Sequence, residues 1–268
     1  MRKKNFNENI IIITGASSGI GYEITKHLLK NYSCKIIGIS KTESKIKSVF
    51  KEYGERFTPL ALDVSKHEDW IKLNNYVIEN DISIYAIVNS AGFLPKFLPF
   101  EKATSSEVFN ALEVNFNSLV YSAQYILPHI RKNNGIMINI TSSSALCPFS
   151  SVSAYSVSKV AAERFSTCLS LEEREATVVT VIPGFTKTNI MRNQDISEKE
   201  AKLIDKISSS SEKVAKKIIK KSLKNKRRII IGLDAHMMNL LYKLFPKTSP
   251  KFISYFLRKS KIKMFKKN

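Results

Sequence analysis

The sequence has 268 residues, of which 43% are hydrophobic and 25% charged, and its 43 Lys and Arg against 23 Asp and Glu give a formal net charge of +20. This composition excludes a disordered or collagen-like chain, and the length suffices for one or two domains with a buried core. No apolar run approaches the roughly 18 residues of a membrane span, and the N-terminus lacks the apolar segment of a secretory signal. The three cysteines are odd in number and widely spaced, so we expect a cytoplasmic protein with neither a disulfide framework nor a metal site.

Short apolar, β-branched runs alternate with helix-length segments through the first 232 residues. The runs lie at 10–14, 34–40, 57–62, 84–90, 135–142, 177–183 and 228–232. The helical segments between them include 20–31, 44–54, 67–80, 105–132 and 155–174. This alternation predicts an α/β fold, a Rossmann-like doubly wound sheet of seven parallel strands with helices on both faces.

Positive charge is concentrated at the C-terminal end of the chain. Residues 1–200 carry 23 basic and 20 acidic side chains, whereas residues 201–268 carry 20 basic and 3 acidic ones, the last of them Asp234. We therefore predict one domain over 1–233 and a basic helical extension over 234–268. Two short amphipathic helices, broken by Pro246 and Pro250, are expected in the extension. Their apolar positions are Met237, Leu240, Leu241, Leu244, Phe245, Phe252, Ile253, Phe256 and Leu257.

The extension has two compatible interpretations. A basic helix with an apolar face suits peripheral association with an anionic membrane surface. The same apolar stripes could instead cover a substrate cleft or a subunit contact, with the lysines facing water. Nucleic-acid binding is the poorer reading, because the aromatic residues lie on apolar stripes and no recognition motif is present.

A glycine-rich turn, TGASSGIG at 14–21, follows the first apolar run and opens a helix. Glycines allow a tight turn whose backbone approaches a pyrophosphate at the positive end of the following helix. The spacing is TGxxxGxG rather than GxGxxG, and an ordinary tight turn is the alternative. Its position after the first strand of a βαβ unit favours dinucleotide binding.

A second cluster contains Ser142, Tyr155 and Lys159. The spacing of Tyr155 and Lys159 puts the phenol and the ammonium on one helix face, where the cation is expected to lower the tyrosine pKa. Ser142 ends the preceding strand, 13 residues before Tyr155. A single Tyr–xxx–Lys pair is common on solvated helix faces, so the pair alone does not establish catalysis.

Together these motifs resemble the classical short-chain dehydrogenase/reductase family over about residues 8–232. TGASSGIG, Asn89-Ser90-Ala91-Gly92, Asn115, Ser142, YSVSK at 155–159 and Pro183-Gly184 follow the family's order and spacing. Ser90 replaces the usual Asn, and Ser144-Ala145-Leu146 stands where a glycine is common, which could alter the floor of the pocket.

The resemblance implies a catalytic set and a cofactor cleft. Tyr155 would be the general acid, Lys159 would lower its pKa and bind the nicotinamide ribose, Ser142 would hold the substrate oxygen, and Asn115 would position a relay water. Gly15, Ser17, Ser18, Gly19, Ile20 and Gly21 would wrap the pyrophosphate. The remaining cofactor contacts would come from Asp63, Val64, Asn89, Ala91, Gly92, Pro183, Gly184 and Thr188. Loop capping is the alternative role for Asp63 and Asn89.

The choice of nicotinamide cofactor depends on the end of the second strand. A carboxylate there would bind ribose hydroxyls and repel a 2′-phosphate. The strand ends instead in Ser40 and Lys41, which favours NADP(H) over NAD(H). An exposed lysine without that role is the alternative.

These features predict an NADP(H)-dependent oxidoreductase that interconverts a ketone and a secondary alcohol on a lipid-, acyl- or steroid-like substrate. The expected lid over about 188–211 carries Ile190, Met191, Ile196, Leu203 and Ile207, which suit such a substrate or simply a helix packed on its own domain. A catalytically silent NADP(H)-binding regulator and a membrane-surface adaptor are the alternatives. The resemblance also implies a homo-oligomer, a dimer or tetramer packed through 105–132 and 155–174.

Overall fold

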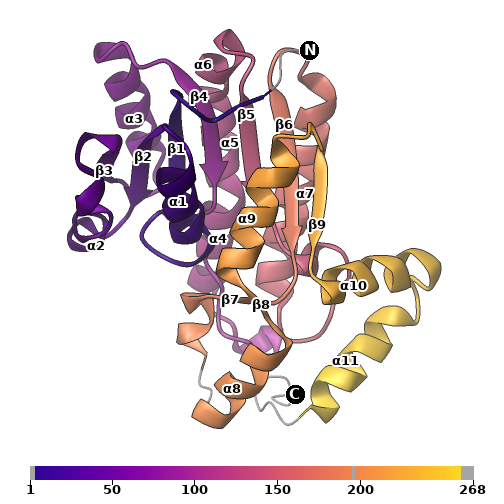
Figure 1. Cartoon of the computed structure of the whole chain (residues 1–268). Helices are drawn as coiled ribbons and strands as arrows, with labels where there is room; N and C mark the ends of the chain where they lie inside the picture. The colour runs from indigo at the N-terminus through magenta and orange to yellow at the C-terminus, as the bar shows by residue number, and fades with distance from the viewer. Residues whose placement is uncertain (1–3, 195–196, 261–268) are drawn as a thin grey trace.

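A single parallel sheet organises the chain in the computed structural model, which describes residues 4–194 and 197–260. Its strands lie in the order β3-β2-β1-β4-β5-β6-β9 (Figure 1). The strands are β1 (Ile10–Thr14), β2 (Lys35–Ser40), β3 (Phe57–Ala61), β4 (Ile84–Asn89), β5 (Ile136–Ile140), β6 (Thr177–Pro183) and β9 (Arg228–Ile231). Every neighbouring pair is parallel, so the predicted Rossmann-like, doubly wound fold is confirmed.

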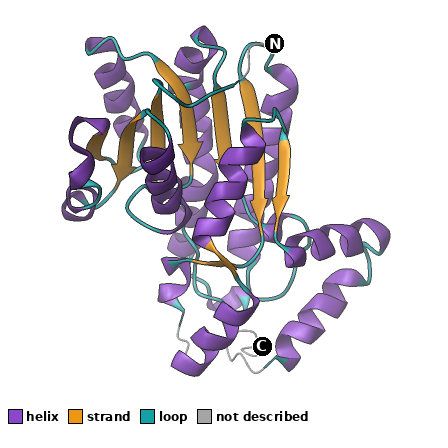
Figure 2. Cartoon of the chain, viewed as in Figure 1, coloured by secondary structure: helices purple, strands orange, loops and turns teal. Residues whose placement is uncertain are grey.

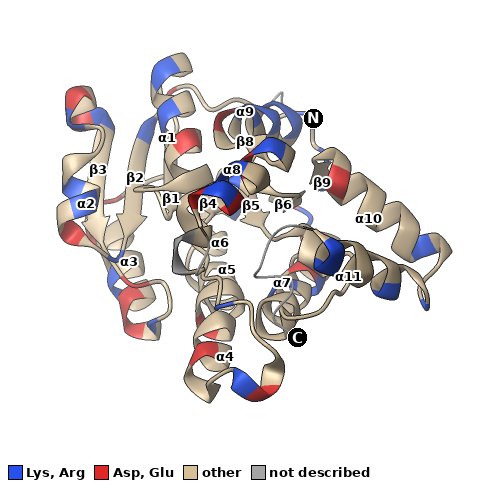
Figure 3. Ribbon diagram, turned by 90° about the horizontal axis from the view of Figure 1, so that it is seen from below, with Lys and Arg blue, Asp and Glu red and all other residues tan. Residues whose placement is uncertain are grey.

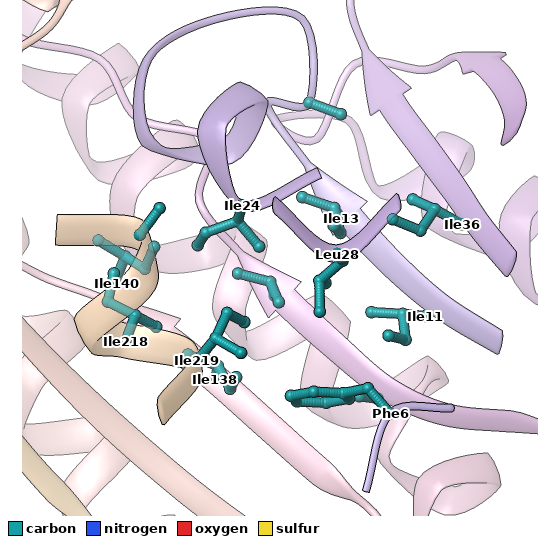
Figure 4. Packing of buried hydrophobic residues seen from close by; sticks show 14 of the residues in the cluster. Phe6, Ile11, Ile13, Ile24, Leu28, Ile36, Ile138, Ile140, Ile218 and Ile219 are labelled. Atoms are coloured by element: carbon teal, nitrogen blue, oxygen red, sulfur yellow. The ribbon is translucent and has the colours of Figure 1, made fainter. Parts of the chain in front are cut away.

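Helices cover both faces of this sheet (Figure 2). On one face lie α1 (Gly19–Asn31) and α9 (Ser211–Ser222), and on the other α3 (His67–Glu79), α5 (Ser118–Tyr125), α6 (Leu127–Lys132) and α7 (Ser153–Glu172). Because successive side chains of a strand point to opposite faces, Ile11 and Ile13 of β1 enter the core under α1 and α9, whereas Ile12 enters the other core. Figure 4 shows the first of these cores.

Two predicted helices are interrupted. The segment 105–132 was expected to be continuous but forms α4 (Ser105–Leu112), a π-helical turn (Glu113–Asn117), α5 and α6. The segment 44–54 becomes α2 (Glu43–Ser48) and a 3₁₀ helix (Lys51–Arg56), separated by Phe50 in the left-handed region at φ 60°. The Phe50 ring is buried and stacks on Tyr22 of α1 with centroids 4.8 Å apart, so packing against α1 accompanies the break.

The remaining elements gather beyond the carboxyl ends of the strands (Figure 1). They are β7 (Thr186–Lys187), a 3₁₀ helix (Asn189–Asn193), α8 (Glu198–Ile207), β8 (Ser209–Ser210), α10 (Leu233–Leu244) and α11 (Ser249–Lys259). Strands β7 and β8 form a second, two-stranded parallel sheet at the base of α8.

The two predicted helices of the extension are confirmed as α10 and α11. The predicted break lies at residues 245–248 and includes Pro246, and Pro250 lies in the first turn of α11, where its missing N–H is tolerated. Ala235 and Met238 of α10 are buried, and Ala235 packs against Ile182 of β6. Residues 261–268 of the predicted extension lie outside the described ranges. Within those ranges, no helix is both long and apolar enough to cross a membrane.

Candidate active site

A cleft of about 670 Å³ opens at the carboxyl ends of the strands. Strand β1 lies between β2 and β4, so the chain winds away from β1 in both directions, and this reversal is where doubly wound sheets bind ligands. Most of the predicted site residues line the cleft together. They are Gly15, Ser17, Ser18, Gly19, Ile20, Ser40, Lys41, Asp63, Val64, Ala91, Gly92, Ser142, Tyr155, Lys159, Pro183, Gly184 and Thr188.

The glycine-rich loop between β1 and α1 is too tight for side chains at several positions. Gly15 and Gly19 have φ values of +68° and +57°, which disfavour a side chain, and a Cβ atom on Gly21 would lie 2.5 Å from the Gly15 carbonyl oxygen. The Thr14 hydroxyl accepts hydrogen bonds from the backbone N–H groups of Ser90, at 3.0 Å, and Ala91, at 3.1 Å. Thr14 thus fastens the loop after β4 to the end of β1, a positioning contact that sequence reasoning did not assign.

Charged and hydroxyl groups lie at the ends of β2 and β3. The Ser17 and Ser40 hydroxyls are 2.8 Å apart, and the Lys41 ammonium lies 2.8 Å from the Asp63 carboxylate. Burial acts to raise the pKa of Asp63, but hydrogen bonds from Lys41 and Ser65 outweigh it and hold that pKa below its ordinary value. Lys45 of α2 also lines this end of the cleft. The cleft therefore offers two lysines here, one of them neutralising the nearby carboxylate.

Helix α7 carries Tyr155 and Lys159 into the cleft. Lys159 is buried, and its ammonium donates a hydrogen bond to the Ile140 carbonyl oxygen at the end of β5, at 3.3 Å. The ammonium lies 5.8 Å from the centre of the Tyr155 ring. Burial lowers the pKa of Lys159 to about 8.

The expectation of a lowered Tyr155 pKa is wrong for this arrangement. Burial raises the pKa of Tyr155, and the hydrogen bond with the Ser142 side chain opposes that effect only in part. The raised pKa keeps the phenol protonated at neutral pH, which is the form that can donate a proton. Ser142 also accepts a hydrogen bond from the Ser144 backbone N–H at 3.2 Å, which orients its hydroxyl.

Three predicted residues, Gly21, Asn89 and Asn115, are not among those lining the cleft. Asn115 lies in the π-helical turn, where its side chain accepts a hydrogen bond from the Phe93 N–H at 2.9 Å and donates to the Phe93 carbonyl at 2.8 Å and to Ser158 at 3.0 Å. Its amide therefore anchors the loop after β4, with both N–H groups engaged, and the role of Asn115 in positioning a relay water stays a prediction.

Asn89 belongs to a buried polar chain that crosses the sheet. Its side chain donates to Asn139 at 2.8 Å, Asn139 donates to Ser166 at 3.0 Å, and the Ser166 and Thr180 hydroxyls are 2.7 Å apart. This series of hydrogen bonds ties β4 to β5, α7 and β6 behind the cleft. Asn89 therefore links two strands and does not cap a loop, which was its alternative role, and its contact with a cofactor stays a prediction.

An apolar cluster closes the cleft beyond Tyr155. Its buried members are Leu94, Phe97, Val152 and Ile204, joined by Phe149, Tyr155, Phe185, Ile190, Met191, Leu203 and Leu257. The buried Gln194 side chain accepts from the Phe97 N–H at 2.8 Å and donates to the Pro95 carbonyl at 2.9 Å, which holds the lid segment over the loop after β4. Ile207 is exposed, and Ile196 lies outside the described residues. No sequence signal distinguished Gln194 from an ordinary surface residue.

The first turn of α10 supports the loop at the end of β6. The Asp234 carboxylate accepts a hydrogen bond from the Phe185 N–H at 2.6 Å. A Cβ atom on Gly184 would clash with the Asp234 carboxyl group, so a larger residue there would displace this side chain. Asp234 was identified from the sequence only as the last acidic residue, and its positioning role was missed.

The groups that line the cleft fit a dinucleotide. A glycine-rich turn meets the start of a helix, lysines lie at one end of the cleft, and Ser142, Tyr155 and Lys159 lie at the other next to apolar side chains. No group of three or more His, Cys, Asp or Glu able to hold a metal ion occurs among the described residues. The fold and this set of side chains fit the class of dinucleotide-binding α/β proteins, with a phenol, an ammonium and a hydroxyl beside the cleft.

The comparisons assign the family. The model of the short chain dehydrogenase family matches residues 9–199, and the chain belongs to that family. The chain is 32% identical over 208 residues to estradiol 17-beta-dehydrogenase 2 of Rattus norvegicus, covering 75% of this chain and 55% of that protein, so it spans little more than half of this relative. It is 26% identical over 204 residues to a probable NADP-dependent dehydrogenase of Haemophilus influenzae, covering 74% and 81%.

Solved structures share the fold. A short chain dehydrogenase from Burkholderia cenocepacia in complex with NADP superposes with a TM-score of 0.77 at 19% identity, covering 91% of this chain and 97% of that one. A short chain dehydrogenase/reductase from Burkholderia phymatum in complex with NAD gives 0.79 at 16% identity, covering 91% and 95%. Both of these solved structures contain a nicotinamide dinucleotide, NADP in the first and NAD in the second.

Proposed function

We propose that this protein uses NADP(H) to interconvert a ketone and a secondary alcohol on a hydrophobic substrate. The observation that carries the proposal is the position of Ser142, Tyr155 and Lys159 between the dinucleotide cleft and the apolar cluster. When bound, the reduced nicotinamide would supply a hydride to the carbonyl carbon. Tyr155 would donate its phenolic proton to the carbonyl oxygen, and Ser142 would hold that oxygen by a hydrogen bond.

Several features support a hydrophobic substrate. The side chains nearest Tyr155 on the lid side, including Phe149, Phe185 and Met191, are apolar and line the cleft. The relative from Rattus norvegicus is named as an estradiol dehydrogenase, which acts on a rigid apolar ring system. An apolar wall of this kind favours a lipid-, acyl- or steroid-like molecule with one reactive oxygen.

Replacement of Tyr155 tests the activity itself. Tyr155→Phe keeps the ring but removes the proton donor, so we expect reduction of a panel of apolar ketones to fall by about 10² to 10⁴, the contribution typical of a general acid. Binding of NADPH, followed by its fluorescence, should be largely retained. Substitution of Tyr76, which lies on α3 away from the cleft, by Phe is the matched control.

Two outcomes would count against this proposal. If Tyr155→Phe turned over ketones as fast as the wild type, Tyr155 would not be the acid. If the wild type bound NADPH but reduced no member of the panel, the silent regulator would become the better reading.

The preference for NADP(H) is tested at Lys41. The Lys41 ammonium is exposed and neutralises Asp63, so it would lie where a 2′-phosphate needs a cation. We expect Lys41→Glu to weaken NADPH binding by about tenfold or more and to strengthen NADH relative to NADPH in fluorescence titrations. Lys35→Glu makes the same charge change at the other end of β2 and should alter neither affinity. Equal effects of the two substitutions would remove the support for a specific 2′-phosphate contact.

A further inference from the structure

Helix α10 presents an apolar stripe to solvent. Leu233, Met237, Leu240 and Leu244 recur at intervals of three or four residues and are each more than half exposed. The opposite side of the helix is buried through Ala235 and Met238. The stripe therefore remains uncovered although α10 is firmly packed on the body of the protein.

Helix α11 repeats this arrangement with aromatic residues. Phe252, Tyr255 and Phe256 are each more than half exposed. The inner side of α11 is held in place, because Leu257 packs in the apolar cluster of the cleft and the Ser254 hydroxyl accepts a hydrogen bond from the Ser150 N–H at 3.2 Å. The aromatic side chains thus project from an anchored helix.

Positive charge lies at the end of α10, in the turn that follows it and along α11. Lys243, Lys247, Lys251, Arg258 and Lys259 are exposed. Figure 3 shows basic positions on α10 and α11, with acid only where α10 begins. That acid is Asp234, whose carboxylate accepts the Phe185 N–H. The surface of the helix pair α10–α11 (residues 233–259) is therefore apolar and cationic beyond its first turn.

We propose that the helix pair α10–α11 docks on an anionic phospholipid surface. Leucine, methionine and aromatic side chains would enter the boundary between head groups and acyl chains, while the lysines and Arg258 would meet the lipid phosphates. A second copy of the chain is a poorer occupant, because the symmetric contact would bring two basic surfaces together with no carboxylate beyond Asp234 to pair with them. The charge of the surface favours lipid.

Docking in this way places the cleft next to the lipid. Leu257 faces the apolar cluster while Phe256, its neighbour in the chain, is exposed on the docking side. A hydrophobic substrate would then pass from the bilayer past α11 to Tyr155 without crossing much water. This consequence rests on the proposed function, whereas docking itself does not.

Vesicle co-sedimentation of the full chain tests the docking. Vesicles of equal parts phosphatidylglycerol and phosphatidylcholine should bind the wild type, and vesicles of phosphatidylcholine alone should bind it far more weakly. The double variant Leu240→Ser, Phe256→Ser should bind the anionic vesicles about tenfold or more weakly. Its matched control is Ile78→Ser with Phe100→Ser, which removes equally exposed apolar side chains from α3 and from the 3₁₀ helix Phe100–Lys102 before α4. This control should bind as the wild type does.

A second pair of variants separates local docking from the charge of the whole molecule. Lys243→Glu, Lys247→Glu and Lys251→Glu together should weaken anionic vesicle binding about a hundredfold or more, since each basic residue near such a surface contributes roughly fivefold. Lys213→Glu, Lys217→Glu and Lys220→Glu change the net charge identically on α9 and should have a much smaller effect. Equal loss in both triple variants would overturn the proposal.

The remaining outcomes are also decisive. Failure of the wild type to bind anionic vesicles refutes docking, and a dimer in sedimentation velocity that Leu240→Ser with Phe256→Ser dissociates would identify a second copy as the occupant. Turnover of a small water-soluble ketone without vesicles is measured in parallel. Turnover without vesicle binding refutes docking alone, and vesicle binding without turnover refutes the proposed function alone.

Discussion

At the scale of single residues, burial dominates the pKa of both Tyr155 and Lys159. The spacing of the two residues predicts that the ammonium lowers the tyrosine pKa, and in the structure burial raises it. The spacing is a local property and could be read from the sequence. The desolvation comes from segments distant in the chain, such as the end of β5 at Ile140, and could not.

Burial of Lys159 leads to a stability prediction. Because the protein holds a cation in a desolvated position, we expect Lys159→Met to raise the free energy of unfolding at neutral pH by roughly 1–3 kcal/mol while it removes turnover. The folded-state pKa is about 8 against an ordinary 10.5. Between these values the unfolded chain binds more protons, so wild-type stability rises with pH there and the advantage of the variant should shrink.

Urea denaturation at neutral pH and at a pH between those two values measures the effect. Lys35→Met, at an exposed position of β2, is the control and should show no such pH dependence. A Lys159→Met variant less stable than the wild type at neutral pH would show that the hydrogen bond to Ile140 outweighs the desolvation.

At the scale of elements, the strands and three of the five predicted helical segments matched their sequence signal closely, and two helical segments did not. Apolar β-branched runs end where the buried sheet ends, so periodicity and burial coincide. The break at Glu113–Asn117 depends on the bonds of Asn115 to the backbone of Phe93, and the break after α2 accompanies the packing of Phe50 on Tyr22. Both involve contacts between distant segments, which a helical period does not encode.

The first turn of α10 gives the prediction at this scale. Asp234→Ala removes the acceptor of the Phe185 N–H and the group packed against Gly184, so the loop after β6 should lose its position. We expect NADPH affinity to fall about 10- to 100-fold, as for loss of a hydrogen bond to a charged group. Fluorescence titration measures the NADPH affinity. We expect Asp234→Asn, which keeps an oxygen acceptor, to recover part of the lost affinity. His236→Ala is the control, because His236 is exposed and lies two residues after Asp234 on α10, and this variant should match the wild type. An unchanged NADPH affinity in Asp234→Ala would show that the loop after β6 holds its conformation without Asp234.

At the scale of the whole molecule, the sequence showed that positive charge gathers at the C-terminal end. It did not show where that end lies in the fold. The count of basic and acidic residues predicts a near-neutral body and a cationic end. Only the fold shows that α11 returns to the lid side of the cleft, where Leu257 joins Leu94 and Val152. The homo-oligomer stays a prediction, and exposed Phe109 of α4 and Val157 of α7 lie on the helices expected to form it.

The position of α10 has a thermodynamic consequence. Its first turn holds the loop at Phe185 beside the nucleotide cleft, and its later turns carry the exposed leucines. If docking of those leucines shifts the helix, docking and nucleotide binding are coupled. The factor by which docking strengthens nucleotide binding then equals the factor by which the nucleotide strengthens docking. The residence time of the protein at a surface would then report whether its cofactor cleft is filled.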